Sequence, residues 1–273
     1  MSRKPPRNAL FGVSIAYMLV VIALAALAPW IAPQDPLAQD LDTRLQAPRQ
    51  ARPLGTDEFG RDVLSRIIYG TRPTLAVTVI AVLVAGSLGL IVGLIAGLSE
   101  GFLEASFMLL MDGVLSFPTV LLAITLVTFL GYGLVQVMLA IGVVFTPLFA
   151  RLVRAETLSV KTAGYVEAAR SLGSSWIGIV VRHIVPNMAG KLIVQAFLTG
   201  ALCIVIESSL SYLGLGTQPP NPSWGLMLKS AQGYLIQAPW MAIYPGLAIA
   251  LTVLSLNIMG DALAERLNPR LKK

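Results

Sequence analysis

The stretch TLAVTVIAVLVAGSLGLIVGLIAGL, Thr74–Leu98, decides the fold class of this chain. It contains no charged side chain, and a helix of about 20 apolar residues is long enough to cross the roughly 30 Å hydrocarbon core of a bilayer. Across all 273 residues, 56% are hydrophobic and only 12% are charged, whereas a soluble domain carries about 25% charged residues. So few charges leave too little polar surface for a soluble protein of this length. The composition therefore predicts an integral membrane protein.

Five further segments around this stretch are apolar enough to span a bilayer. They are Leu10–Ile31, Phe107–Leu130, Leu134–Phe149, Leu192–Leu215 and Trp240–Met259. Leu134–Phe149 reaches the required length if its helix continues past Arg151. The first segment exceeds the roughly 7–15 apolar residues of a signal-peptide core, so we interpret it as a retained anchor. The sequence predicts an all-α membrane protein with six transmembrane helices.

The Lys and Arg residues are concentrated in alternate connections between these spans. If the N-terminus lies inside, thirteen of the twenty fall in cytoplasmic segments, as the positive-inside rule requires. These thirteen are Arg3, Lys4, Arg7, Arg151, Arg154, Lys161, Arg170, Arg182, Lys191, Arg266, Arg270, Lys272 and Lys273. Both termini are therefore predicted to be cytoplasmic. The net charge of +6 is a signal of topology, and no nucleic-acid partner is expected.

The chain is predicted to divide at residue 72. Residues 1–72 form an N-terminal anchor helix and an extracytoplasmic segment, and residues 73–273 form a five-helix core that includes the loop 156–191. In the extracytoplasmic segment a short helix is predicted from Thr56, which would cap it, with an ion pair between Asp62 and Arg66 four residues later. A second outer segment, Gly216–Pro239, is stiffened by prolines and carries Trp224 for the membrane interface. Structural support is the first interpretation of both segments; docking of a delivery protein and substrate-side gating are the alternatives.

The segment 156–191, between the fourth and fifth spans, is predicted to be cytoplasmic and structured. Tyr165–Leu172 favours a helix, Gly173 interrupts it, and Trp176–Ile184 continues as a second helical stretch until Pro186. A helix–turn–helix held outside the bilayer offers another protein a surface through which it can move the spans.

This segment resembles the EAA loop of bacterial ABC import permeases, which seats in a groove of the ATPase subunit. The resemblance rests on the sequence EAA at 167–169, the following glycine, and IVP at 184–186. The residues to which it assigns ATPase coupling are Glu167, Ala168, Ala169, Arg170, Gly173, Ile184 and Pro186. No glycine-rich GxxxxGK[ST] phosphate loop occurs in the sequence.

Two more stretches are similar to the C-type permeases of dipeptide, oligopeptide and nickel importers. The first resembles their GTDxxGRD signature, and its residues are Gly55, Thr56, Asp57, Gly60, Arg61 and Asp62. The second is the run Glu207–Gly216, continuing through Pro219 and Pro220 to Trp224-Gly225. Together with the EAA-like loop they cover nearly the whole chain.

The resemblance implies a type I ABC importer permease fold in a bacterial cytoplasmic (inner) membrane. The chain would pair with a B-type permease subunit and bind two ABC ATPase subunits, while an extracytoplasmic substrate-binding protein delivers the substrate. ATP would be bound by the partner subunits, so no cofactor and no catalytic residue is expected in this chain. The cargo stays open among peptides, opines, glutathione-like molecules and nickel chelates.

Two acidic residues lie inside predicted spans, where charged groups are costly and usually face the protein interior or a cavity. Glu207, in the outer half of its span, would contact the amino end of a peptide or brace a gate by hydrogen bonding. Asp112 lies near the start of its span, so the inner interface suits it as well as the pathway does. With the neighbouring serines, the candidate pathway or gate residues are Asp112, Glu207, Ser208 and Ser211.

Glycines recur at near-helical spacing in the stretch Thr74–Leu98, at positions Gly86, Gly89, Gly93 and Gly97. Such a stripe predicts a seam of close helix packing, with an internal hinge as the alternative. The sole cysteine, Cys203, lies in an apolar run, and with the single His183 it does not predict a metal site.

Three other classes of membrane protein compete with this interpretation. An ion-gradient-driven secondary transporter would need coupling ionisable groups near the midplane and usually an inverted repeat, and no convincing repeat is seen. A membrane-bound enzyme would need a catalytic constellation that the sequence lacks. A passive channel has no use for a structured cytoplasmic loop. Dependence of uptake on a cognate ATPase distinguishes the permease from all three.

Overall fold

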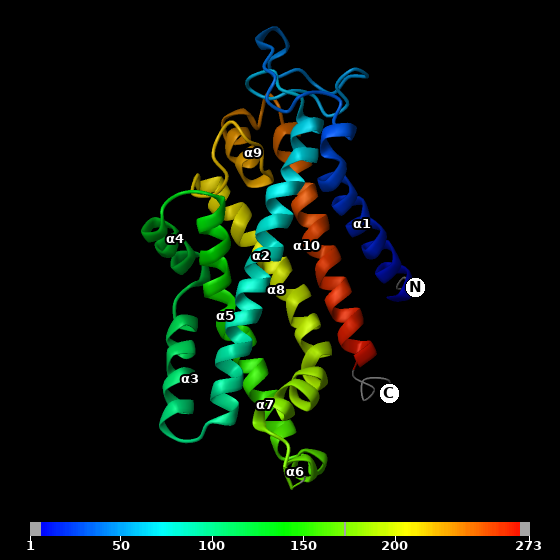
Figure 1. Cartoon of the computed structure of the whole chain (residues 1–273). Coiled ribbons are helices and arrows are strands. Elements are labelled where there is room, and N and C mark those ends of the chain that lie inside the picture. Colours follow the sequence, from blue (N-terminus) through cyan, green and yellow to red (C-terminus); the bar gives the residue numbers. More distant parts are fainter. Residues whose placement is uncertain (1–6, 172, 268–273) are drawn as a thin grey trace, which may run out of the picture.

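The computed structural model of the chain describes residues 7–171 and 173–267, which form a bundle of long helices (Figure 1). Five helices are long and apolar enough to span a membrane. They are α1 (Arg7–Ile31), α2 (Val63–Leu98), α5 (Leu134–Lys161), α8 (Val185–Leu213) and α10 (Trp240–Leu267). The predicted continuation of the fourth span past Arg151 is confirmed. Five basic residues used to predict the topology, Arg3, Lys4, Arg270, Lys272 and Lys273, lie outside the described residues.

The segment predicted as one continuous span, Phe107–Leu130, is broken in two. It forms α3 (Phe102–Leu115) and α4 (Thr119–Leu130), whose axes are bent by 97° at the break. Pro118 stands at the start of α4 with ψ 125°, outside the helical region. Because proline cannot donate the backbone hydrogen bond that a continuous helix needs and disfavours a helical residue before it, the helix stops here. Taken together, the two halves are long and apolar enough for a sixth span, so the predicted third span is present as a bent pair of helices and not as one helix.

Helices α2 and α5 form the centre of the bundle. Their apolar side chains make the main core cluster, with contributions such as Val77 and Ala81 from α2 and Ile141 and Phe149 from α5. The helices approach so closely at Gly89 that an added Cβ would lie 2.3 Å from Cβ of Phe149. The predicted packing seam is confirmed at Gly89, Gly93 and Gly97, which all face α5. Since α2 is a single helix through this stretch, the alternative of an internal hinge is not seen.

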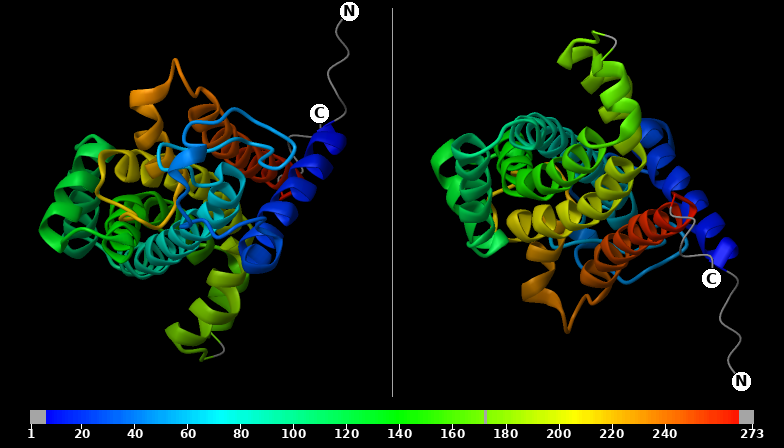
Figure 2. Two further views of the ribbon diagram at one scale, coloured as in Figure 1. Left: turned by 90° about the horizontal axis from the view of Figure 1, so that it is seen from above. Right: turned by 90° about the horizontal axis from the view of Figure 1, so that it is seen from below.

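Helix α1 lies at the edge of the bundle against α2 and α10 (Figure 2). Tyr17 reaches from α1 to α10, where its hydroxyl lies 3.2 Å from Oγ1 of Thr252. At the other end of α1, Arg72 of α2 donates from Nε to the carbonyl oxygen of Ala25 at 2.7 Å. These contacts fix the anchor helix on the core, although most of its apolar surface faces outward.

The two ends of the bundle carry different structures (Figure 1). One end holds α6 (Gly164–Ser171) and α7 (Trp176–Ile179), and α1 begins and α10 ends toward this side. The other end is covered by residues 32–62, with the 3₁₀ turn Leu41–Thr43, and by α9 (Trp224–Ala231) with the 3₁₀ turn Gln232–Tyr234. The predicted inner and outer segments therefore lie at opposite ends.

Candidate functional site

The predicted cytoplasmic loop forms a helix–turn–helix that projects from its end of the bundle (Figure 1). Helix α6 ends at Ser171, and Gly173 follows with φ +86°, in the left-handed region that favours glycine. Ser175 then caps α7 by accepting the N–H of Gly178 at 3.2 Å. A π-helical turn, Val180–Ile184, leads directly into α8. The predicted interruption at Gly173 is confirmed.

The base of this loop is packed into the bundle. Val166, Ile179 and Ile184, each at most 1% exposed, form an apolar cluster with Val153 of α5 and Met188 of α8. A displacement of the loop must therefore displace the ends of α5 and α8, because densely packed side chains transmit strain.

The residues assigned to ATPase coupling take two different positions. Four of them share the short helix α6, namely Glu167, Ala168, Ala169 and Arg170. Gly173 is exposed beside this helix and Pro186 is exposed in the first turn of α8. Ile184 is fully buried, so it anchors the loop and cannot touch a partner. Among these residues, Gly173 and Pro186 are therefore exposed and Ile184 belongs to the buried base of the loop.

At the opposite end, the signature residues 55–62 form a turn and not the predicted helix. Gly55 and Gly60 have φ of +75° and +71°, and the Thr56 hydroxyl accepts the N–H of Gln46 at 2.8 Å. The N-terminal cap of α2 is Asp62, which accepts the N–H of Ser65 at 2.8 Å. The prediction that Thr56 caps a helix was wrong, because its side chain is bound to a distant part of the segment.

Asp57 is the centre of a buried cluster of charges in this turn. Its Oδ2 accepts Nε of Arg61 at 2.6 Å and lies 3.4 Å from Nε of Arg66. The predicted pair between Asp62 and Arg66 is not formed, since Asp62 caps the helix instead. Arg66 also donates to the carbonyl oxygen of Pro36 at 2.9 Å. One arginine thereby joins the signature turn to the start of the outer segment.

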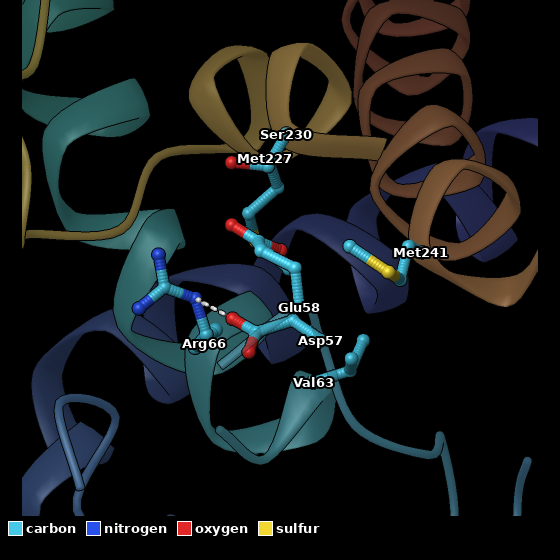
Figure 3. A pocket seen from close by; sticks show the side chains of 7 residues that line it. All are labelled: Asp57, Glu58, Val63, Arg66, Met227, Ser230 and Met241. Carbon is cyan, nitrogen blue, oxygen red and sulfur yellow. Dashed lines mark ion pairs between the residues drawn. The ribbon is translucent and has the colours of Figure 1, made fainter. Parts of the chain in front are cut away.

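A small cavity lies beside this cluster, between the signature turn, α9 and α10 (Figure 3). Its empty volume is about 230 Å³, and much of that is open to solvent. The lining residues are Asp57, Glu58, Val63, Arg66, Met227, Ser230 and Met241. The enclosed part has room for about one water molecule. The cavity is therefore too small for a peptide.

Two tryptophans, neither of which the sequence singled out as a long-range contact, hold the outer segments together. Nε1 of Trp240 donates to the carbonyl oxygen of Thr56 at 3.1 Å. Trp224 is 1% exposed, and its Nε1 donates to the carbonyl oxygen of Ile67 at 3.1 Å. A buried indole N–H usually finds such a partner, but the sequence does not reveal which carbonyl it finds.

The candidate pathway residues do not come together in one site. Asp112 is about half exposed on α3 and pairs with Arg151 of α5 at 2.5 Å. Glu207 is fully buried in α8, with Ser208 and Ser211 bonded to its carboxyl group. In this arrangement Glu207 faces its own chain, which corresponds to the bracing interpretation.

Comparison with known proteins places this geometry in a family. Residues 89–273 match the family described as binding-protein-dependent transport system inner membrane component. The chain belongs to this family. Residues 7–48 also match the N-terminal transmembrane domain of oligopeptide transport permease C, so the anchor helix α1 is part of the resemblance.

Two relatives align with almost the whole length of the permease. It is 42% identical over 257 residues to the glutathione transport system permease protein GsiD of Pectobacterium atrosepticum, covering 94% of this chain and 85% of the relative. It is 41% identical over 264 residues to the di/tripeptide transport system permease protein DppC of Pseudomonas aeruginosa, covering 94% and 87%. The fold resembles the inward-facing MetNI methionine ABC transporter, with a TM-score of 0.62, 20% identity, and coverage of 74% of this chain and 96% of that one.

These matches establish the chain as a permease subunit of a binding-protein-dependent ABC importer of the bacterial inner membrane. Such a system works with a binding protein and with ATPase subunits. The matches favour the ABC permease over the ion-gradient-driven carrier, and the family is one of transport proteins.

The permease also contains a charged seam that sequence reasoning missed. Acids on or just before α3 face bases on α5 in three ion pairs: Glu100 with Lys161, Glu104 with Arg154, and Asp112 with Arg151. The hydrogen bond and positive charge of Lys161 lower the pKa of the Glu100 carboxyl below its usual range. The three pairs tie α3 to the helix that leads into the cytoplasmic loop.

Proposed function

We propose that this permease and a B-type permease subunit together form the pathway by which peptides, or related small solutes such as glutathione, enter the cytoplasm. The observation that carries the cargo class is the pair of relatives above 40% identity, one named for glutathione and the other for di- and tripeptides. Glutathione is itself a modified tripeptide. The shared chemistry is a short chain of amide bonds with a free amine and free carboxylates.

The driving force comes from outside this chain. Two ATPase subunits bind the loop 156–191, and ATP is held by them with no cofactor in the permease. Support comes from α6, which projects from the bundle while the base of its loop is buried among α5 and α8. Closure of the ATPases would therefore move the ends of two spans, as alternating access between two packed arrangements requires.

The same geometry supports an orientation of the permease in the membrane. The end that carries α6 and α7 is cytoplasmic, and α1 begins and α10 ends toward that side. Eight of the basic residues assigned to the inside are described, and they belong to elements that reach this end: Arg7, Arg151, Arg154, Lys161, Arg170, Arg182, Lys191 and Arg266. The signature turn and α9 then face the binding protein.

The left-handed turn at Gly173 provides a test of the coupling role. A β-branched residue is strained at φ +86°, whereas asparagine tolerates this region. We therefore expect Gly173→Val to lose most ATP-dependent uptake in proteoliposomes with the partner subunits, while Gly173→Asn keeps it. The matched control is Gly164→Val, because Gly164 begins the same α6 helix without a positive φ and with open space around it.

The readouts separate coupling from folding. Membrane insertion and monodispersity in detergent should be unchanged in all three variants, and co-purification of the ATPase subunits should fall for Gly173→Val alone. Equal uptake by Gly173→Val and the wild type would show that the shape of this loop does not carry the coupling.

A further inference from the structure

Glu207 is a carboxyl group enclosed entirely by its own chain. It lies in the outer half of α8, is 0% exposed, and accepts the hydroxyl of Ser211 at Oε1 over 2.7 Å. The Ser208 hydroxyl lies 3.4 Å from the other oxygen, Oε2. Within the described part of the chain it makes no ion pair. A carboxyl group in such a place is costly unless its hydrogen bonds are made, so the serines are the contacts that keep it there.

Ser211 extends the contact to the segment that follows α8, Gly214–Ala231, called here the outer segment. Oγ of Ser211 donates to Glu207 and lies 3.4 Å from the N–H of Thr217, which it accepts. The chain crosses Ser211 so closely that a Cβ on Gly216 would lie 2.2 Å from that same Oγ. The beginning of the outer segment is therefore in direct contact with the Ser211 hydroxyl.

The backbone of Ser208 makes a second contact with the outer segment. A Cβ on Gly225, in α9, would lie 2.3 Å from the carbonyl oxygen of Ser208. The adjoining Trp224 is buried against α2, where Gly70 leaves it room and the carbonyl of Ile67 accepts its N–H. Helix α9 therefore packs against α8 at Ser208 and against α2 at Gly70.

We propose that Glu207 is a positioning residue of the permease, which orients the Ser211 hydroxyl and thereby holds the outer segment in place for passage of the substrate. A serine in a helix that loses its acceptor turns to bond its own helix carbonyl four residues earlier, as Ser209 does with Val205 at 2.8 Å. Without Glu207, the Ser211 hydroxyl would rotate toward its own helix and the N–H of Thr217 would lose its acceptor. The proposal rests on the proposed transport function only in its last step, because the seating of the segment is measurable without any substrate.

The direct measurement is the reactivity of a cysteine placed in the outer segment. Thr217→Cys is a mild substitution, because Thr217 is 7% exposed and its Oγ1 has no hydrogen-bond partner. The native Cys203 is fully buried and gives little background. In this variant we expect slow labelling by a membrane-impermeant maleimide. Adding Glu207→Leu should raise the rate at least tenfold, whereas adding Glu207→Gln should leave it nearly unchanged, because the amide oxygen still accepts from Ser211.

A pair of neighbouring serines supplies the matched control and guards against misfolding of Glu207→Leu. Ser211→Ala should raise the labelling rate as Glu207→Leu does, while Ser209→Ala, which removes only a bond within α8, should not. Peptide uptake in proteoliposomes should follow the same order, with Glu207→Gln and Ser209→Ala retaining most of it.

Two results would overturn the proposal. If Glu207→Gln is labelled as fast as Glu207→Leu and transports as poorly, the negative charge of Glu207 matters and not its hydrogen bond to the serine. If Glu207→Leu and Ser211→Ala both label at the rate of the parent, the carboxyl group does not position the outer segment. Failure of the wild type to transport peptides would count against the proposed cargo alone, since the labelling rates do not depend on it.

Discussion

Arg154 of α5 donates from Nε to Oε1 of Glu104 on α3 at 2.9 Å, across 50 residues of sequence. Helix α3 buries only one of its own apolar side chains, Met111, and three ion pairs join it and the turn before it to α5. Because α5 continues into the cytoplasmic loop, this pair joins the broken span to the element that we propose meets the ATPases.

The first prediction concerns the strength of this pair. In a double-mutant cycle with Glu104→Gln and Arg154→Gln, we expect a coupling free energy of about 1 kcal/mol, because the pair is partly buried and two donors of one guanidinium reach the same oxygen. Thermal unfolding in detergent measures it. The control cycle is Asp112→Asn with Arg151→Gln, whose side chains are 55% and 52% exposed. A coupling free energy as large for Asp112 and Arg151 as for Glu104 and Arg154 would contradict the claim that the partly buried pair is the stronger one.

The second prediction concerns the seam between α2 and α5. Gly89→Ala should destabilise the permease by about 1–3 kcal/mol, because the new Cβ would also lie 2.9 Å from the backbone nitrogen of Ala150. Gly86→Ala is the control: its Cβ would lie 3.7 Å from the ring of Phe149, an ordinary contact, and alanine stabilises a helix by up to about 1 kcal/mol over glycine. Apparent melting temperatures in detergent compare them. A Gly89→Ala variant as stable as Gly86→Ala would show that the two helices pack less closely.

The third prediction concerns the charge cluster of the signature turn. Asp57→Ala should destabilise the permease by about 3–5 kcal/mol, because it leaves Arg61 and Arg66, which are 5% and 3% exposed, without their buried partner. Asp40→Ala should lower stability by at most about 1 kcal/mol, since Asp40 is 44% exposed and pairs with Arg52 at 3.2 Å. Melting temperatures again provide the comparison. Similar losses in both variants would mean that Asp57 is not the centre of this cluster.

Much of the helical framework was predictable from hydropathy, because lipid-spanning helices need long uncharged runs and this chain has them. Five runs became continuous helices, and the glycine spacing in Thr74–Leu98 correctly indicated a packing seam. The break at Pro118 was missed because the apolar run continues through it. The proline itself was the available signal, since the residue before a proline rarely stays helical.

The details of the candidate sites were less predictable, because they depend on contacts between distant segments. Thr56 and Asp57 have the composition of a helix start. The Thr56 side chain instead bonds to Thr43 and Gln46, and Asp57 pairs with Arg61 and Arg66. Asp62 takes the capping role. The hydrogen bond from Trp240 to Thr56 spans 184 residues, and no local sequence pattern predicts it. For Glu207, the depth in the span was predictable from the sequence but the direction of its side chain was not, so bracing and substrate contact could not be separated.

The most direct test of the central claim is uptake of a labelled di- or tripeptide into proteoliposomes that contain this permease, its partner subunits and the binding protein. We predict accumulation only when ATP is supplied on the side of α6, with no uptake driven by a proton or sodium gradient alone. Peptide uptake that persists without the ATPase subunits and follows an ion gradient would contradict the account.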